Sequence, residues 1–270
     1  MRISVTASPL LHASPVGPIH SDTGRHLPLG LDSVTVTGGS WAPYLERNAL
    51  TTIPHAQSWM EKLGWVGNFA AVVEGTIAAV REGREFSDSD VYKLMEAMAW
   101  EIGRTGDPDM ERRFQELAAV ITPAQESDGY LNTRFGHEGQ EPRYSNFEWG
   151  HELYCAGHMF QAAIARLRTT GPDDFTAAAV RVADHLCEIF GEGGRDAVGG
   201  HPEVETALVE LGRTLDEPRY TALAARFLDL RGRGLLGEIE FGQQYFQDDE
   251  PVYEATVLRG HSVRALYLAA

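Results

Sequence analysis

The feature that most constrains the fold of this chain is a helical unit that occurs three times. Each copy contains the end of an amphipathic helix, a short turn that combines Arg-Thr with Pro and Asp, and an aromatic residue that opens the next helix. The copies are residues 99–114, 163–175 and 208–220. Such a unit cannot bury its apolar face alone, so successive units must stack. The repeat therefore predicts an all-α chain of stacked helical hairpins.

Capping residues mark the boundaries of the first hairpin. Residues 87–90 have the spacing of a capping box and precede an apolar stripe with helical period, which ends near Gly103. Asp107 and Pro108 then supply a cap and a first-turn proline. We therefore expect one helix over about residues 87–103 and a second from residue 108.

The N-terminal part of the chain lacks this periodicity. Residues 1–31 are rich in Pro, Gly, Ser and His, and are expected to form an irregular arm before a helical domain over residues 32–270. Residues 34–37 are a β-branched alternating run closed by Gly38 and Gly39, which predicts one short strand.

Long loops rich in glycine and aromatic residues separate the hairpins, at residues 127–150, 191–200 and 232–250. Short turns at one end of the stack and long loops at the other leave the long-loop end free to build a site.

A Gly-His pair follows each long loop, at the start of the next predicted helix. The histidines are His151, His201 and His261. Equivalent positions in three successive hairpins predict that the three side chains share one cleft. Free N–H groups and the partial positive potential of helix N-termini suit sugar hydroxyls or carboxylates. We therefore assign these histidines as candidate substrate-binding residues.

The first long loop contains residue types that bind carbohydrates. Asp128, Tyr130 and Asn132 lie close together in sequence, and Tyr144 and Trp149 follow. Sugar C–H faces stack on aromatic rings, while sugar hydroxyls need paired donors and acceptors. Asp128 and Tyr130 are therefore further candidate substrate-binding residues. Packing of the loop aromatics against the domain explains the same pattern equally well.

No metal ligand is assigned from the sequence. His151 and His158 are nearly two helical turns apart, whereas a zinc-binding helix has its two histidines one turn apart. The two cysteines, Cys155 and Cys187, have no closely spaced partner and lie in predicted helices, so neither a disulfide framework nor a zinc signature is present. His185 and Cys187 are most simply helix-packing residues.

No catalytic residue is assigned either. Pro202 is expected at the first position of a helix, with Glu203 and Glu205 in its first turn, and capping explains these acids as well as a function does. Most glycosidases have two carboxyl groups on opposite sides of the scissile bond, and the spacing of the acids selects no such pair.

The charge of the chain limits its partners. A formal net charge of −16 argues against nucleic acid or an anionic membrane, because both attract clustered Lys and Arg. It also favours neutral sugars over polyanionic ones. No apolar run approaches the ~20 residues that cross a bilayer. Residues 1–20 lack a basic start and an apolar stretch, so we expect no secretory signal and a cytoplasmic location.

The last predicted helix stops at Ala270 without a capping residue, as if the chain were cut within an amphipathic helix. Its apolar stripe contains Val263, Leu266, Tyr267 and Ala270. An uncovered stripe of this kind favours self-association, so we also consider a homo-oligomer.

Five motifs occur in an order that resembles the glycoside hydrolase family 127 β-L-arabinofuranosidases. They are residues 86–93, 125–133, 150–158, 200–205 and 260–265. The resemblance runs from about Trp41 to the C-terminus and implies an (α/α)6 barrel that binds a small neutral sugar or arabinoside in its central cleft. It matches His151, His201 and His261 to residues that contact the arabinofuranoside.

The resemblance also implies what this chain lacks. In the family, the second half of the barrel contains the acid/base Glu, the nucleophilic Cys, and the Glu and Cys ligands of a zinc ion. β-Sandwich domains follow the barrel. No segment of this chain matches these catalytic residues, zinc ligands or domains. Cys155 belongs to a helix motif of the first half and is not the nucleophile. Leu45 stands where some members have a polar sugar-contacting residue. We expect the first half to two-thirds of the barrel, without a cofactor unless the Cys-rich segment is present.

The expected function of a completed barrel is release of non-reducing-end β-L-arabinofuranose by a retaining route through a covalent cysteine intermediate. This chain alone is expected to lack the catalytic half. Two alternatives remain: a non-catalytic sugar-binding or helical-repeat scaffold protein, and another (α/α)6 sugar enzyme such as an unsaturated glucuronyl hydrolase or an epimerase.

Overall fold

The structure is a computed structural model that describes residues 14–15, 29–31 and 33–270. Every regular element within these residues is helical. The elements are α1 (Ala42–Arg47), the π-helix η1 (Asn48–Thr52), α2 (Ile53–Lys62), α3 (Gly67–Val73), α4 (Ile77–Val80), α5 (Ser87–Thr105), α6 (Pro108–Ile121), the 3-10 helix η2 (Thr122–Ala124), α7 (Glu152–Thr169), α8 (Asp174–Phe190), α9 (Val204–Leu215), α10 (Pro218–Leu230), the 3-10 helix η3 (Gln243–Phe246) and α11 (Ser262–Ala269). The predicted N-terminal arm, residues 1–31, lies mostly outside the described residues.

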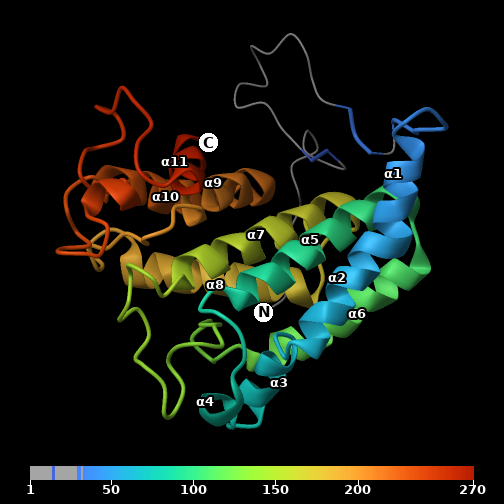
Figure 1. The fold of residues 1–270 in the computed structure, drawn as a ribbon, viewed down its shortest axis with the longest axis horizontal. Helices are drawn as coiled ribbons and strands as arrows, with labels where there is room; N and C mark the ends of the chain where they lie inside the picture. The colour runs from blue at the N-terminus through green and yellow to red at the C-terminus, as the bar shows by residue number, and fades with distance from the viewer. Residues whose placement is uncertain (1–13, 16–28, 32) are drawn as a thin grey trace.

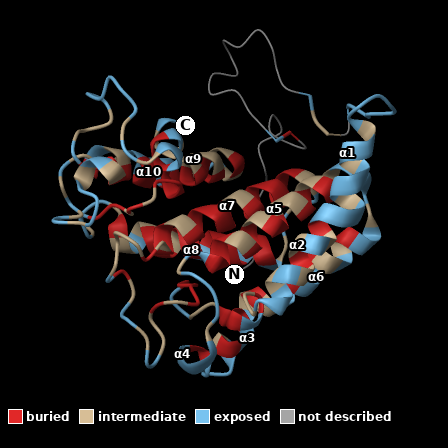
Figure 2. Cartoon of the chain, viewed as in Figure 1, coloured by how far each residue is buried: buried red, intermediate tan, exposed pale blue. Residues whose placement is uncertain are grey.

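The predicted stack of hairpins is confirmed. The pairs α5/α6, α7/α8 and α9/α10 are each joined by a short turn, and the long loops lie together at the opposite end, on the left in Figure 1. Helix α7 packs between α5 and α9, while α6, α8 and α10 pack behind their hairpin partners. The result is two curved layers, with the most deeply buried residues between them (Figure 2).

Local turn chemistry explains the short connections. Helix α5 ends at Thr105, two residues beyond the predicted end at Gly103, because Gly106 takes the left-handed conformation (φ 66°). The Asp107 side chain accepts a hydrogen bond from the backbone N–H of Asp109 at 2.9 Å, which caps α6 as predicted. Asp173 forms a capping box with Thr176 at the start of α8.

The predicted strand at residues 34–37 is wrong. This segment has no regular structure, and its Val34 and Val36 side chains are 51% and 42% exposed. A strand needs a partner for its backbone groups. The described residues contain no second strand, so the β-branched run has nothing to pair with.

The predicted capping box at residues 87–90 is also wrong. Helix α5 begins at Ser87 but has no side-chain cap. The Ser87 hydroxyl donates instead to the Arg84 carbonyl at 2.7 Å. Asp88 is buried and accepts hydrogen bonds from the Thr133 N–H and hydroxyl at 2.8 and 2.6 Å. The acid therefore ties α5 to the first long loop instead of capping its own helix.

Proline does not open α9 as predicted. The helix begins at Val204, after an N-cap residue, Glu203, whose side chain makes no capping bond. Glu205 does serve the helix start, because its Oε2 accepts the Glu203 N–H at 3.0 Å. Pro202 thus belongs to the turn between His201 and the helix.

Two groups of exposed apolar side chains lie near the ends of the described helical domain. One is α1 with η1, where Trp41, Tyr44 and Leu50 are 70%, 61% and 68% exposed. The other is α11, where Val263 and Leu266 are 46% and 60% exposed. Among the described residues, no helix combines the length and apolar character needed to cross a membrane.

Candidate functional site

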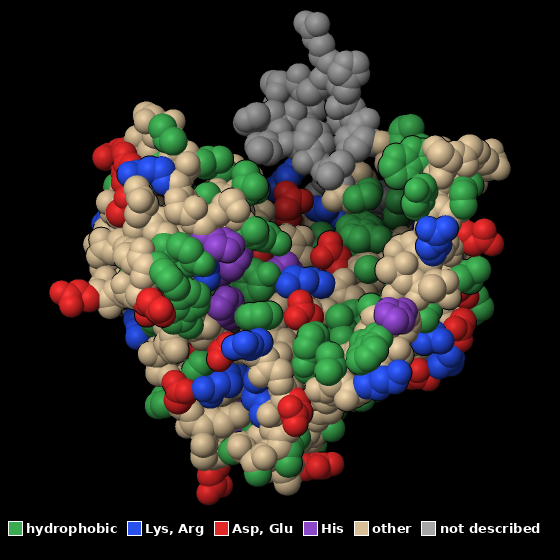
Figure 3. Space-filling model, in the orientation of Figure 1, with side chains coloured by type: hydrophobic (Ala, Val, Ile, Leu, Met, Phe, Trp, Pro, Cys, Tyr) green, Lys and Arg blue, Asp and Glu red, His purple; other side chains and the backbone are tan. Residues whose placement is uncertain are grey.

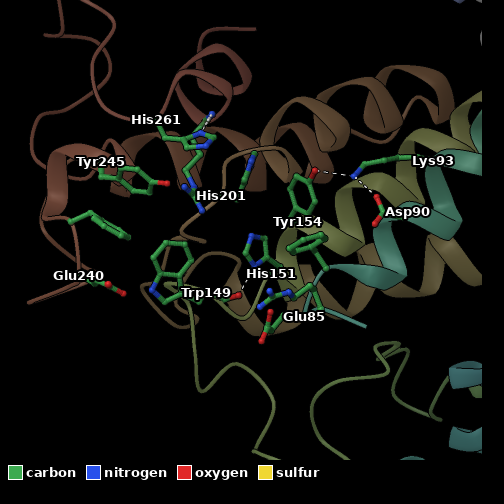
Figure 4. Close-up of a pocket in the computed structure, with 14 residues that line it drawn as sticks. Glu85, Asp90, Lys93, Trp149, His151, Tyr154, His201, Glu240, Tyr245 and His261 are labelled. Atoms are coloured by element: carbon green, nitrogen blue, oxygen red, sulfur yellow. Dashed lines mark hydrogen bonds and ion pairs between the residues drawn. The ribbon is translucent and has the colours of Figure 1, made fainter. Parts of the chain in front are cut away.

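A cavity of about 770 Å³ opens at the long-loop end of the hairpins (Figure 4). Its wall comes from the start of α5, the start of α7, the loops before α9 and α11, and η3. Figure 3 shows histidine side chains gathered beside hydrophobic and charged ones on this face. The lining residues are Arg84, Glu85, Phe86, Asp90, Lys93, Trp149, His151, Tyr154, His201, Glu240, Phe241, Tyr245, His261 and Arg264.

The three histidines of the Gly-His repeat meet in this cavity. His151 is the N-cap of α7, His201 precedes α9, and His261 is the N-cap of α11. The ring centroids are 6.0 Å apart for His151 and His201, and 6.3 Å apart for His201 and His261. The predicted convergence of the rings is therefore present, and their binding of a sugar stays a prediction.

The glycine of each pair has a structural reason. A Cβ at Gly150 would lie 2.3 Å from the Asn146 carbonyl oxygen. A Cβ at Gly200 would lie 2.1 Å from the Glu148 carbonyl oxygen, and one at Gly260 2.1 Å from that of Gln244. Each histidine is thus preceded by a close backbone crossing that a side chain would block.

Backbone hydrogen bonds set the tautomers of His151 and His201. The His151 Nδ1 contacts the Trp149 carbonyl oxygen, and the His201 Nδ1 lies 2.8 Å from the Pro202 carbonyl oxygen. Because a carbonyl only accepts, each Nδ1 carries the proton and donates it. In the neutral rings, Nε2 is then a hydrogen-bond acceptor.

His261 has the opposite arrangement. Its Nδ1 accepts the Arg264 N–H at 3.4 Å, so the neutral ring carries its proton on Nε2, as a donor. Burial lowers the pKa of all three histidines, that of His201 to about 3. The imidazoles are therefore neutral near pH 7, and together offer two acceptors and one donor.

A tyrosine and a lysine complete the wall beside His201. The Tyr154 ring lies 4.4 Å from the His201 ring, centroid to centroid. Lys93 donates to the Tyr154 hydroxyl at 3.0 Å and to Asp90 at 3.2 Å. Sequence reasoning missed Tyr154 and Lys93 as lining residues. The available signal was helical spacing, since Tyr154 follows His151 by three positions and so shares its face of α7.

Aromatic side chains form the opposite wall. The Trp149 and Tyr245 ring centroids lie 6.2 Å apart, and the exposed Phe241 contacts both rings. The Arg264 guanidinium lies over Trp149 at 5.3 Å and over Tyr245 at 4.9 Å. Flat aromatic faces beside neutral imidazoles are suited to a ligand with C–H faces and hydroxyl groups.

Asp128 and Tyr130 do not line this cavity. Tyr130 is only 2% exposed and donates its hydroxyl proton to Glu152 at 2.5 Å. Asp128 accepts from Arg143 at 2.6 Å. Both side chains hold the first long loop in place, so the geometry favours the packing interpretation of this loop.

Two buried carboxyl groups lie near the histidines. Burial raises the pKa of Glu152 to about 7 and also raises that of Glu203. Glu203 is 1% exposed, and its Oε1 lies 3.7 Å from His158 Nδ1. Both carboxyls are enclosed behind the wall of the cavity and do not line it.

Neither cysteine resembles an activated thiol. Cys155 is 1% exposed in α7, and burial raises its pKa. Burial raises the pKa of Cys187, on α8, to about 11. Nucleophilic and metal-binding thiols instead have lowered pKa values. Within the described part of the chain, no group of three or more His, Cys, Asp or Glu side chains could hold a metal ion, so these residues do not fit a zinc site.

Comparison with known proteins relates the chain to arabinofuranosidases. The family model for the β-L-arabinofuranosidase GH127 catalytic domain matches residues 33–270. A curated relative, the non-reducing end β-L-arabinofuranosidase of Bifidobacterium longum subsp. longum, is 33% identical in an alignment 219 residues long that covers 73% of this chain and 33% of the relative.

Two solved structures match the same helices. A GH127 β-L-arabinofuranosidase from Geobacillus stearothermophilus T6 superposes with a TM-score of 0.80 at 31% identity, over 87% of this chain and 40% of that one. A structure described as a GH127 β-arabinofuranosidase superposes with a TM-score of 0.81 at 32% identity, over 89% and 39%. The chain thus matches part of an (α/α)6 barrel and spans about 40% of these solved relatives.

Proposed function

Because the chain belongs to the GH127 β-L-arabinofuranosidase family, we propose that its histidine cavity binds a non-reducing terminal β-L-arabinofuranoside. The observation that carries the proposal is the convergence of three neutral imidazoles, two accepting and one donating, beside aromatic rings. A furanose presents hydroxyls that both donate and accept, and C–H faces that stack on rings. The neutral imidazoles add no charge, and the charged lining side chains are three cations and three acids, so the lining has no net charge that would select a carboxylated sugar.

In this proposal the residues of the chain bind and orient the sugar, and the rest of the barrel cleaves it. A retaining glycosidase needs a nucleophile on one side of the scissile bond and an acid on the other. Both cysteines here have raised thiol pKa values, and the two buried glutamates do not reach the cavity. The family resemblance assigns the acid, the nucleophilic Cys and the zinc to the second half of the barrel, which these residues do not include.

The test is a binding experiment on the 270-residue chain. We expect methyl β-L-arabinofuranoside to bind in calorimetric titration. His201→Ala should weaken binding about fivefold, since one hydrogen bond contributes ~1 kcal/mol. The melting temperature should stay close to that of the wild type, because the His201 ring packs at the cavity wall and outside the main core.

A matched control is His55→Ala, which removes an exposed histidine of α2 and should leave binding unchanged. Parallel loss of affinity and melting temperature in His201→Ala would show a structural role for this histidine. Absence of sugar binding by the wild-type chain would instead support the scaffold alternative, and preferential binding of D-glucuronate would support a uronic-acid enzyme.

A further inference from the structure

A fully buried arginine lies behind the cavity and contacts three separate segments. Arg231 immediately follows α10 and is 0% exposed. Its Nη2 donates to the Gly199 carbonyl at 2.7 Å and to Glu205 Oε1 at 3.2 Å, and its Nη1 donates to the Phe246 carbonyl at 3.1 Å. The planar guanidinium therefore bridges the loop before α9, the first turn of α9 and the end of η3.

The first two contacts hold the segment that carries His201. Gly199 lies two residues before this histidine. Glu205 uses its second oxygen, Oε2, to accept the Glu203 N–H at 3.0 Å, two residues after it. The backbone on both sides of His201 is therefore tied, directly or through Glu205, to the same guanidinium.

The third contact holds the segment that carries His261. Phe246 ends η3, and the neighbouring Tyr245 carbonyl accepts the His261 N–H at 3.2 Å. Gly260 crosses η3 so closely that a Cβ there would lie 2.1 Å from the Gln244 carbonyl oxygen. A shift of η3 would consequently carry the His261 backbone with it.

We propose that Arg231, with Glu205 as its partner, is a positioning residue that sets the separation of His201 and His261 at the cavity. It does not line the cavity and acts only through these backbone contacts. A buried ion pair adds little net stability relative to an apolar pair of the same size, whereas three directed hydrogen bonds fix a geometry. The assignment rests on the proposed function only where it concerns sugar affinity; the coupling of the two loops stands without it.

The main test variant is Arg231→Met with Glu205→Gln. Changing Arg231 alone would leave the buried Glu205 carboxylate without its cation, and this unpaired charge could unfold the chain whatever the role of Arg231. The double change avoids this. A matched control is a second Arg–Glu pair elsewhere in the stack, where buried Arg168 of α7 donates to Glu210 of α9 at 2.7 Å. The control variant is therefore Arg168→Met with Glu210→Gln.

The readout is NMR of the histidine ring nitrogens in the whole chain, with signals assigned by single histidine variants. We expect the Arg231 and Glu205 variant to shift the His201 and His261 signals, and the control variant to leave both unchanged. Affinity for methyl β-L-arabinofuranoside should fall about tenfold in the former only, equivalent to ~1.4 kcal/mol. Unchanged imidazole signals together with lowered melting temperatures in both variants would overturn the proposal.

Arg231→Lys separates charge from geometry. Lysine keeps the charge beside Glu205, but its single ammonium cannot span the three acceptors that the guanidinium reaches. We expect this variant to fold and still shift both histidine signals; wild-type signals and wild-type affinity would overturn the proposal. If the wild-type chain binds no arabinofuranoside while the NMR response occurs as expected, the proposed function fails and the positioning role stands.

Discussion

Glu152 shows how a single buried side chain supports the cavity from outside it. This residue directly follows His151, and its Oε1 lies 2.5 Å from the Tyr130 hydroxyl while its Oε2 accepts the Tyr144 N–H at 2.8 Å. The Tyr130 hydroxyl in turn lies 3.4 Å from the Phe135 carbonyl. Both hydrogen bonds to Glu152, from the Tyr130 hydroxyl and from the Tyr144 N–H, favour the ionised carboxylate, but burial favours the neutral acid more strongly.

The stability of the chain should depend on the protonation of Glu152. Burial raises the pKa of this carboxyl from 4.5 to about 7, so the folded state binds a proton more tightly than the unfolded state. The stability that this proton supplies is present below pH 4.5 and is lost as the pH rises through about 7. Glu152→Gln mimics the protonated acid and should remove a slope of up to ~1.4 kcal/mol per pH unit in that window.

Urea unfolding of wild type and variant across this pH window measures the difference. Glu74→Gln, at the exposed end of α3, is the matched control and should leave the slope unchanged. Equal pH slopes in wild type and Glu152→Gln would show that Glu152 is ionised in the folded state.

At the level of elements, α7 is the centre of the fold because it packs against both α5 and α9. Its contact with α9 depends on Gly157. The Glu203 carboxyl occupies the space beside this glycine, and a Cβ there would lie 1.4 Å from Glu203 Oε2. The missing side chain therefore makes room for a buried acid of the next hairpin.

Gly157→Ala should consequently destabilise the chain by ~1–3 kcal/mol, the usual effect of overpacking. This outcome opposes helix propensity, which favours alanine over glycine by about 1 kcal/mol within a helix. Gly67→Ala at the start of α3, where no heavy atom lies within 4 Å of the added Cβ, should have little effect. Equilibrium unfolding in urea measures both.

A double-mutant cycle identifies the cause. Adding Glu203→Ala to Gly157→Ala removes the clash, so the double variant should be more stable than the sum of the single changes predicts. Additive effects would mean that the new methyl group is accommodated without displacing Glu203.

For the molecule as a whole, the main constraint on activity is that the chain matches only part of the barrel of its solved relatives. The chain spans about 40% of the solved relatives, no cysteine lines its cavity, and burial raises the pKa of the Cys155 thiol. We therefore expect the purified chain to hydrolyse no chromogenic β-L-arabinofuranoside and to bind no stoichiometric zinc by elemental analysis. Turnover that disappears in Cys155→Ser but persists in Cys187→Ser would contradict this and would assign Cys155 a catalytic role.

The apolar face of α11 leads to a second expectation at this scale. Val263 and Leu266 are exposed, whereas Tyr267, predicted to share that exposure, packs on His201 at 5.6 Å between ring centroids. The patch is therefore smaller than the sequence predicted. Changing both residues to serine should reduce concentration-dependent self-association in light scattering. The control is the same change at Val73 and Val80, which are 57% and 52% exposed. An equal reduction of self-association in the control would show that the α11 face is not the surface through which the chains associate.

The sequence alone determined the hairpins, their short turns, the long-loop end and the convergence of His151, His201 and His261. The turns depend on interactions within a few residues, such as the Asp107 cap and the left-handed Gly106. The convergence of the histidines follows from the repeat, because successive repeats place equivalent residues at equivalent positions in the stack.

The tertiary structure decided which polar side chains line the cavity and which support it from behind. Tyr130 is paired with Glu152 and lies outside the cavity, Asp88 binds Thr133 in place of its own helix end, and Arg231 reaches the Phe246 carbonyl. Each of these partners is between 15 and 45 positions away along the chain. The local sequence pattern cannot predict such pairs, because the packing of the hairpins and loops on one another determines which polar groups are buried and which partners they face.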